Sequence, residues 1–403
     1  MRGHMKKISC ALLILSLLAL PCYSQKGIRQ VMEENFALAA QHARNMASAL
    51  NSYPDLLPRT IDASGKLVTC NSSWWTSGFF PGTLWLLFEK NKDPKFGEYA
   101  KLFTAKIEKE KNNTGTHDLG FMLYNSFGNG LRLSNDPAYR EVLLTGARSL
   151  ISRFNPRIGC IMSWNPSAKW KYPVIIDNMM NLEFLMWAYK SSGDPAFRDI
   201  AVTHADTTIK NHFRKDYSSY HVVSYDPATG QVEKKQTSQG YADESSWARG
   251  QSWGLYGFVM MYRETGQKRY LDQARHIAAY LINHPNLPPD KVPYWDYNAP
   301  NIPNEKRDAS AAAIMASALV ELSGYSDPEP AKKYLEVAIR QIQTLSSFEY
   351  RAEPGTNGNF ILKHSVGSVP GNSEVDVPLS YADYYFLEAM KRLQGTKIGA
   401  SGR

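Results

Sequence analysis

Residues 173–190 read PVIIDNMMNLEFLMWAYK, and this stretch indicates the fold. From Met179 onward it is apolar on nearly every side, and only Asn181 and Glu183 interrupt it before Lys190. A helix that is apolar on all sides is buried on all sides. We therefore expect this segment to be an inner helix of a larger helical assembly.

Asp177 lies at the start of this helix, where its carboxylate could simply cap the first turn. Asp118 has the same position in THDLGFMLYNSFGNGL, residues 116–131, at the head of another apolar helix. Two carboxylates at the entrances of two neighbouring buried helices could face one pocket, which is the usual arrangement for acid–base chemistry. Besides the capping role, the pair makes Asp118 and Asp177 candidate catalytic residues.

Amphipathic helices alternate with the apolar ones along the rest of the chain. Most of them open on an Asp that can cap the helix and a Pro that suits its first turn. These turns are Asp93-Pro94, Asp136-Pro137, Asp194-Pro195 and Asp327-Pro328, with Gly266-Gln267 in the corresponding place before 268–283. The apolar helices are expected at 78–89, 118–132, 178–190, 248–262, 308–323 and 377–393.

A further amphipathic helix at 28–50 brings the outer set to six. Six buried helices, each paired with an amphipathic one, predict a single all-α domain in which an outer ring wraps an inner ring. An open helical solenoid is the alternative. Alternating strand patterns are confined to possible short hairpins near 217–236 and 358–366.

The composition of the 403 residues is that of an ordinary globular protein, with 43% hydrophobic and 21% charged residues. Residues 1–24 predict a signal peptide, with Lys6 and Lys7 before a short apolar run and Ser24 at a plausible cleavage site. Residues 1–4, upstream of Met5, could be additional to this segment. The apolar run is too short for a membrane span, so we expect export across the inner membrane to the periplasm.

The mature chain would be a catalytic domain at 25–395 followed by a flexible tail at 396–403. Loss of Arg2, Lys6 and Lys7 lowers the net charge from +8 by 3 to +5. Without a basic cluster this charge does not indicate a nucleic-acid partner, but it is compatible with an acidic small substrate. Cys70 and Cys160 could form a disulfide or remain two buried thiols.

The long loops before the inner helices carry the candidate binding residues. Trp74 and Trp75 are adjacent, so both cannot point inward, and one could line a site. In residues 236–258, QTSQGYADESSWARGQSWGLYGF, Arg249 lies between two tryptophans. Its planar guanidinium suits the carboxylate of a uronic sugar, although a pairing with Asp243 or Glu244 is an equal alternative.

Metal and cofactor chemistry is not indicated. His117 and His221 lack the close spacing of a zinc site, and no further His or Cys joins them. The chain has no phosphate-binding glycine loop and no Gly-x-Ser-x-Gly motif. We therefore expect neither a metal nor a nucleotide cofactor.

The chain resembles glycoside hydrolase family 88, the unsaturated glucuronyl hydrolases. The resemblance covers most of the mature chain and rests on THDLGF (116–121), DNMMNLEFLMWA (177–188), QGYADESSWARGQSWGLYGF (239–258) and VDVPLSYADYYFLEA (375–389). It implies an (α/α)6 barrel, in agreement with the helix pairs above. It also implies a glycosidase that removes the unsaturated uronic acid, with its C4=C5 double bond, from oligosaccharides left by polysaccharide lyases, as in glycosaminoglycan degradation.

In this family the enol ether is hydrated, and the anomeric carbon is not attacked. By the resemblance, Asp177 is the general acid and base, while Asp118 stays ionised and holds the sugar. The substrate-binding residues that it implies are His221, Gln239, Trp247, Arg249 and Trp253, to which we add His117 and Trp75. Two rival functions are an unsaturated rhamnogalacturonyl hydrolase of the related family and a non-catalytic sugar-binding barrel, which would need no paired acids.

Overall fold

The computed structural model describes residues 27–397. The predicted signal peptide at 1–24 lies outside this range, as does most of the predicted tail, so both remain predictions. No helix within the described range is long and apolar enough to cross a membrane.

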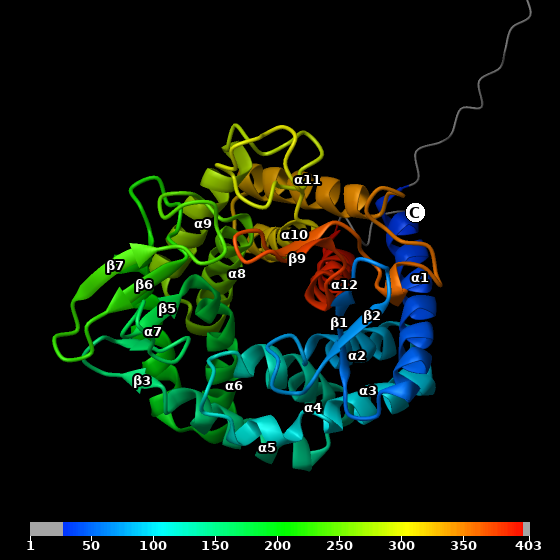
Figure 1. The fold of residues 1–403 in the computed structure, drawn as a ribbon, viewed down its shortest axis with the longest axis horizontal. Coiled ribbons are helices and arrows are strands. Elements are labelled where there is room, and N and C mark those ends of the chain that lie inside the picture. The colour runs from blue at the N-terminus through cyan, green and yellow to red at the C-terminus, as the bar shows by residue number, and fades with distance from the viewer. Residues whose placement is uncertain (1–26, 398–403) are drawn as a thin grey trace, which may run out of the picture.

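Six helical segments form the inner ring of the molecule (Figure 1). They are α2 (Phe79–Asn91), η3 (Gly120–Gly128) continued by α4 (Asn129–Ser134), η4 (Ile176–Asn181) continued by α6 (Leu182–Ser192), α8 (Ala248–Thr265), α10 (Ala309–Ser323) and α12 (Ser380–Gln394). Each agrees with one of the predicted apolar stretches. Burial is nearly complete in α10, where residues 309–320 are all buried, because these helices have neighbours on every side.

Six amphipathic helices surround the inner ring. They are α1 (Ile28–Ala49), α3 (Pro94–Ala105), α5 (Pro137–Ile151), α7 (Pro195–His212), α9 (Lys268–Asn283) and α11 (Pro328–Leu345). Asp93, Asp136 and Asp194 each accept a hydrogen bond from the backbone N–H two residues ahead, so the Asp-Pro turns are true N-caps. At Asp327 the Asp-Pro turn forms without that side-chain bond.

The ring is closed, because the last inner helix packs against the first. α12 contacts both α10 and α2, and α1 contacts α11 and α12 (Figure 1). This confirms the predicted (α/α)6 barrel and excludes the open solenoid.

Two inner helices begin with irregular turns that the sequence pattern did not predict. The predicted helix at 118–132 starts as a π-helix, η3, and the one at 178–190 is preceded by the 3-10 turn η4. The two beginnings are in close contact: a Cβ on Gly120 would lie 2.6 Å from Asn181 Oδ1, which accepts a hydrogen bond from the Phe121 N–H. The irregular turns thus coincide with a close tertiary contact, which a periodicity of apolar residues does not record.

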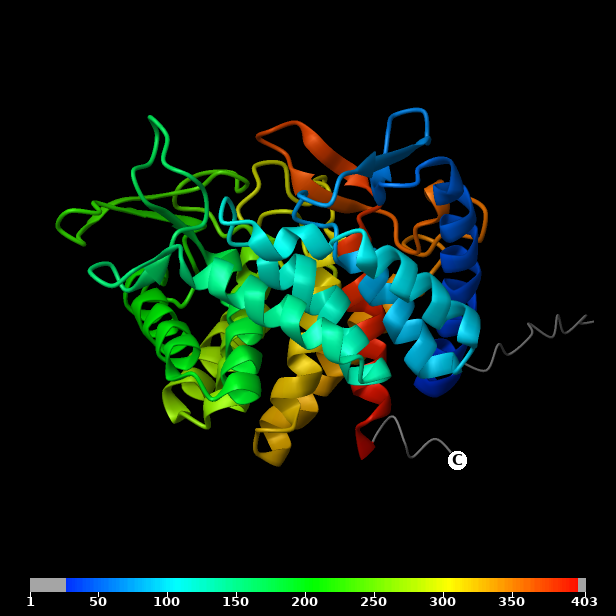
Figure 2. The same ribbon diagram turned by 90° about the horizontal axis from the view of Figure 1, so that it is seen from below.

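Short hairpins lie at the end of the barrel where the inner helices begin (Figure 2). The paired strands are β1 (Leu57–Ile61) with β2 (Leu67–Cys70), β3 (Phe154–Asn155) with β4 (Cys160–Ile161), β5 (Pro173–Ile175) with β6 (Val222–Tyr225) and β7 (Val232–Gln236), and β8 (Ser365–Ser368) with β9 (Ser373–Val377). The hairpin predicted near 217–236 is present. The one predicted near 358–366 was misplaced, because the strands that pair are the polar segments on either side of 369–372.

Cys70 and Cys160 are free, buried thiols, so the structure selects the second of the two alternatives. Burial raises the pKa of the Cys70 thiol to about 12 and that of Cys160 still further. Both therefore remain protonated and behave as small apolar side chains.

Candidate active site

Asp118 and Asp177 lie together at the entrance of the barrel. Asp118 comes two residues before η3, and Asp177 is in the first turn of η4. These two segments are in contact, and the charge of Asp118 is close enough to raise the pKa of Asp177. The structure thus unites the two carboxylates that the sequence paired.

The Asp177 carboxyl is an acid in a nearly dry environment. Its side chain does not cap η4, so the capping role is wrong, and its Oδ2 atom has no hydrogen-bond partner. Burial raises the pKa of Asp177 to about 7, Arg249 opposes the shift and Asp118 adds to it. Burial is therefore the main cause of the raised pKa, and the charge of Asp118 is a smaller one.

His221 faces Asp177 in its neutral form. Its Nδ1 accepts hydrogen bonds from the backbone N–H groups of Ser238 and Gln239, at 3.1 and 3.2 Å. The ring proton is therefore on Nε2, which lies 3.8 Å from Asp177 Oδ2. Burial, followed by the Arg249 charge, holds the pKa of His221 well below its ordinary value. His221 is thus a fixed hydrogen-bond donor at the pocket, because its protonation would place a second ring proton against two N–H groups.

Asp118 is oriented by its own loop. Thr116 Oγ1 donates a hydrogen bond of 2.8 Å to Asp118 Oδ2, and the Asp118 N–H donates one of 3.1 Å back to Thr116 Oγ1. His117 Nε2 lies 3.3 Å from the other carboxylate oxygen. Burial lowers the pKa of His117, against the opposing effect of Asp118, so His117 lies beside Asp118 as a neutral ring.

Arg249 is buried and is held by an acid other than the two that the sequence suggested. Its Nη1 lies 3.5 Å from Asp308 Oδ2, and its Nη1 and Nη2 donate to the carbonyls of Val366 and Gly367 in β8. Gln239 Nε2 donates to the same Gly367 carbonyl, at 3.1 Å. Two predicted substrate-binding residues therefore hold the β8–β9 hairpin over the barrel mouth.

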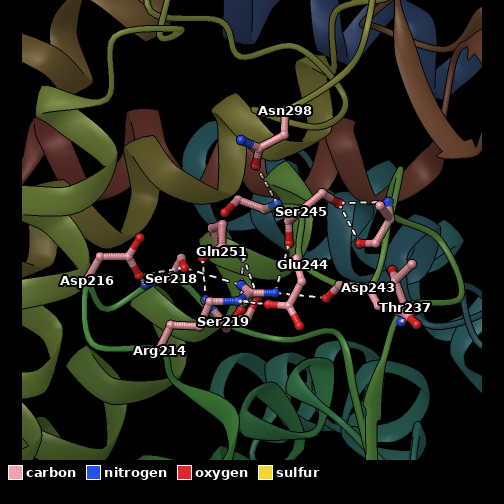
Figure 3. A network of polar contacts seen from close by, with 12 residues as sticks. Arg214, Asp216, Ser218, Ser219, Thr237, Asp243, Glu244, Ser245, Gln251 and Asn298 are labelled. Carbon is pink, nitrogen blue, oxygen red and sulfur yellow. Dashed lines mark hydrogen bonds and ion pairs between the residues drawn. The ribbon is translucent and has the colours of Figure 1, made fainter.

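Asp243 and Glu244 belong instead to a polar network around Arg214 (Figure 3). Arg214 Nε lies 3.1 Å from Glu244 Oε2, and its Nη2 donates to the Asp243 carbonyl at 2.8 Å. Gln251 bonds to Ser219 in the same network (Figure 3). The proposed pairing of Arg249 with Asp243 or Glu244 is therefore wrong, because α8 starts at Ala248 and carries Arg249 away from that loop.

Two predicted tryptophans, Trp247 and Trp253, lie beside His221 and Asp177. Trp247, the residue before α8, lies 4.5 Å from the His221 ring and has the Arg249 guanidinium 4.5 Å above its own ring. Trp253 is fully buried and has no hydrogen-bond partner for its indole N–H, although it is near enough to affect Asp177. Unpaired polar atoms of Asp177, His221 and Trp253 thus face one site, and such buried groups normally have partners.

The adjacent Trp74 and Trp75 point in different directions, as the sequence required. The half-buried Trp75 lies 4.8 Å from Tyr381 and 5.6 Å from Phe121, next to the pocket. Trp74 instead lies under the Arg59 guanidinium, at 3.9 Å.

Sequence reasoning missed two neighbours of the site, Asp308 and Tyr381, whereas Trp164 lies in the loop that it expected to approach Asp177. Asp308 caps α10 through its Oδ1 and faces Arg249 with its Oδ2. Tyr381 lies in the first turn of α12, 5.3 Å from the Arg249 guanidinium, and its hydroxyl is buried without a partner. Trp164 meets His221 edge-on at 5.9 Å. Asp308 and Tyr381 begin apolar helices as Asp118 and Asp177 do, and this position was the signal that could have found them.

A cavity of about 550 Å³ is lined by residues further along the inner helices, among them Tyr124, Trp187, Glu388 and Arg392. It is distinct from the acid pair. Within residues 27–397, no three His, Cys, Asp or Glu residues are grouped so that they could hold a metal ion.

The structure is a closed double ring of helices with two neighbouring carboxylates where the inner helices begin. Residues 59–400 match the family model of Glycosyl Hydrolase Family 88. The unsaturated glucuronyl hydrolase of Formosa agariphila is 44% identical over 398 residues, which is 97% of this chain and 99% of that protein.

Solved structures agree with this match. The crystal structure of an unsaturated glucuronyl hydrolase specific for heparin superposes with a TM-score of 0.88 at 48% identity, covering 91% of this chain and 97% of that one. A Streptococcus agalactiae unsaturated glucuronyl hydrolase mutant complexed with dGlcA-GalNAc6S has a TM-score of 0.78 at 29% identity, covering 92% and 93%.

The chain belongs to glycosyl hydrolase family 88 and is therefore a glycosidase. This confirms the family and the enzyme class that the sequence motifs predicted. It also removes the two rivals, the related rhamnogalacturonyl family and the non-catalytic barrel.

Proposed function

We propose that this enzyme removes a C4=C5 unsaturated uronic acid from the non-reducing end of oligosaccharides released by glycosaminoglycan lyases, with Asp177 as its general acid and base. The observation that carries the proposal is the acid pair: Asp177 is buried with a pKa near neutrality, beside Asp118 at the mouth of the barrel. Its relatives support the substrate class, because they are unsaturated glucuronyl and unsaturated chondroitin disaccharide hydrolases.

In the proposed reaction Asp177 donates its proton to C4 of the double bond, and positive charge develops on C5 and the ring oxygen. The resulting Asp177 carboxylate then takes a proton from the water that attacks C5. The hemiketal so formed opens and releases the next sugar. Asp118 would stabilise the developing positive charge and hold ring hydroxyls, a role that requires its negative charge.

The remaining polar groups would position the sugar. His221 offers its Nε2–H beside Asp177, and Trp253 offers an indole N–H that has no other partner. The Arg249 charge would attract the uronate carboxylate, although its two terminal nitrogens already bond to β8. Trp75 and Trp247 would supply apolar faces for the ring.

The substrate class is tested by incubation with unsaturated disaccharides from heparin, chondroitin and hyaluronan, while the ultraviolet absorbance of the conjugated double bond is followed. We expect the heparin product to be hydrolysed, because the heparin-specific structure is 48% identical to this chain. Persistence of the absorbance with every disaccharide would contradict the proposal. The predicted export to the periplasm is part of the same proposal, since lyase products of a polymer arise outside the cytoplasm.

The pH dependence of the reaction follows from Asp177. Because its pKa is raised to about 7, the proton that the reaction needs is held at neutral and acidic pH and is lost as the pH rises through that value. We expect kcat/KM for one unsaturated disaccharide to fall about tenfold per pH unit above this point. Measurement between about pH 5 and 9 checks this, and a flat profile on the alkaline side would exclude Asp177 as the acid.

A further inference from the structure

We propose that Lys169 and Lys234 form a sulfate-binding rim beside the catalytic pocket, where they recognise a sulfate group on the sugar that leaves. The inference rests on the proposed function and specifies its substrate further. Its basis is a row of rings that leads from Asp177 outward to these two lysines.

The row starts at His221, whose Nε2 is 3.8 Å from Asp177 Oδ2. Trp164 meets the His221 ring edge-on at 5.9 Å, and Trp170 lies 5.4 Å from Trp164 at an angle of 38°. Both tryptophans are half-buried. A sugar next to the unsaturated uronate could therefore rest along this wall, since half-exposed indoles are typical sugar platforms.

The wall is held in place by the β5–β6–β7 sheet. Trp170 Nε1 donates a hydrogen bond of 3.0 Å to Gln236 Oε1 on β7. Lys234 is two residues from Gln236 on the same strand, so both side chains project from one face. Lys234 Nζ indeed reaches the Lys169 carbonyl, at 3.5 Å. The loop at 164–170 and the strand therefore bring two lysines to the same aromatic wall.

Both ammonium groups are available to a ligand. Lys169 Nζ lies 4.2 Å above the Trp170 ring, and both lysines are exposed. Within residues 27–397, neither has a carboxylate within ion-pair distance. After burial, Arg249 and His212, the Lys169 charge also helps to lower the pKa of His221, so it lies near the pocket.

Lys171, two residues after Lys169 in the chain, is paired with acids. Its ammonium lies 2.6 Å from Glu233 and 3.2 Å from Asp226, on the other side of the same hairpin. Its charge is neutralised by two acids, so it provides a matched control. The contrast assigns anion binding to the unpaired lysines and leaves Lys171 a structural ion pair.

A sulfate is the anion that fits this position. It is a strong hydrogen-bond acceptor that attracts an ammonium group without a fixed geometry, and sulfate esters and N-sulfates occur on the amino sugars of glycosaminoglycans. The unsaturated uronate itself occupies the inner pocket in the proposed reaction, so the rim would contact the neighbouring sugar.

The experiment compares Lys169→Met, Lys234→Met, the double variant and Lys171→Met. Its substrates are unsaturated uronates linked to N-acetylglucosamine without sulfate, to the 6-sulfated form, and to N-sulfated glucosamine. For at least one sulfated disaccharide, we expect each lysine variant to lower kcat/KM about fivefold at low ionic strength, mainly through KM, with a larger loss for the double variant. Added salt should shrink the difference.

For the unsulfated disaccharide, all variants should stay within about twofold of the wild type, as should Lys171→Met for every substrate. Equal losses with sulfated and unsulfated substrates, no loss in the lysine variants, or an equal loss in Lys171→Met would each overturn the inference. All of these results leave the proposed function intact. That function fails separately, if the wild type hydrolyses none of the unsaturated disaccharides from heparin, chondroitin and hyaluronan.

Discussion

Asp177→Asn should lower turnover of an unsaturated disaccharide by at least about 100- to 10,000-fold, the usual contribution of general acid–base catalysis. The amide has the size of the carboxyl but cannot transfer a proton to C4. Since Asp177 neither caps its helix nor has a bond to its Oδ2, we expect the variant to fold normally. Turnover is followed by the loss of absorbance of the double bond, and near wild-type activity in a normally folded variant would show that Asp177 is not the acid.

The thermal stability of the same variant is a second test of the buried acid. Because folding raises the pKa of Asp177 to about 7, the folded protein favours the protonated carboxyl. Ionisation of this carboxyl therefore costs folding free energy, and the full cost is reached once the pH is above about 7. Asp177→Asn removes that cost, so above this pH its melting temperature should equal or exceed that of the wild type. A clear drop would mean that Asp177 serves the fold.

Asp118→Asn is the companion variant. It should also impair turnover, but through the loss of charge stabilisation and of sugar positioning, while the proton donor remains. The alkaline fall in kcat/KM should therefore persist in Asp118→Asn. It should shift to lower pH, because the neighbouring negative charge that helps to raise the Asp177 pKa is gone.

Arg249→Met should destabilise the enzyme by about 3–5 kcal/mol, the usual result of leaving one partner of a buried ion pair alone. Both Arg249 and Asp308 are almost fully buried, at 1% and 0% exposure. The variant also loses the donors to Val366 and Gly367 that hold the β8–β9 hairpin. The shift of the thermal and urea unfolding midpoints measures the effect.

Two further variants separate the causes. Asp308→Asn in the Arg249→Met background removes the unpaired charge and should recover part of the stability. If the double variant is no better than the single one, the hairpin contacts dominate. Arg249→Lys keeps the charge without the planar guanidinium, so we expect a smaller loss of stability but about a tenfold weaker binding of the uronate. Unchanged affinity would show that Arg249 serves only the internal pair.

Much of this molecule could be read from the order of its residues. The alternation of uniformly apolar with amphipathic helices predicted the double ring, because burial on all sides requires neighbours on all sides. The Asp-Pro turns predicted helix starts, because capping and the fixed backbone of proline act within a few residues. Asp118 and Asp177 were found for the same reason: each begins an apolar helix.

The tertiary structure decided what depends on neighbours distant in the chain. The protein acids considered for Arg249 from the sequence were the local ones, yet Arg249 pairs with Asp308, whose helix lies next to α8 in the ring. The π-turn of η3 and the 3-10 turn of η4 arise where the two helix starts press together at Gly120. Above all, the raised pKa of Asp177 comes mainly from burial. The sequence identifies Asp177 as a candidate acid. Only the folded barrel excludes water from its carboxyl, and this desolvation keeps the carboxyl protonated near neutral pH.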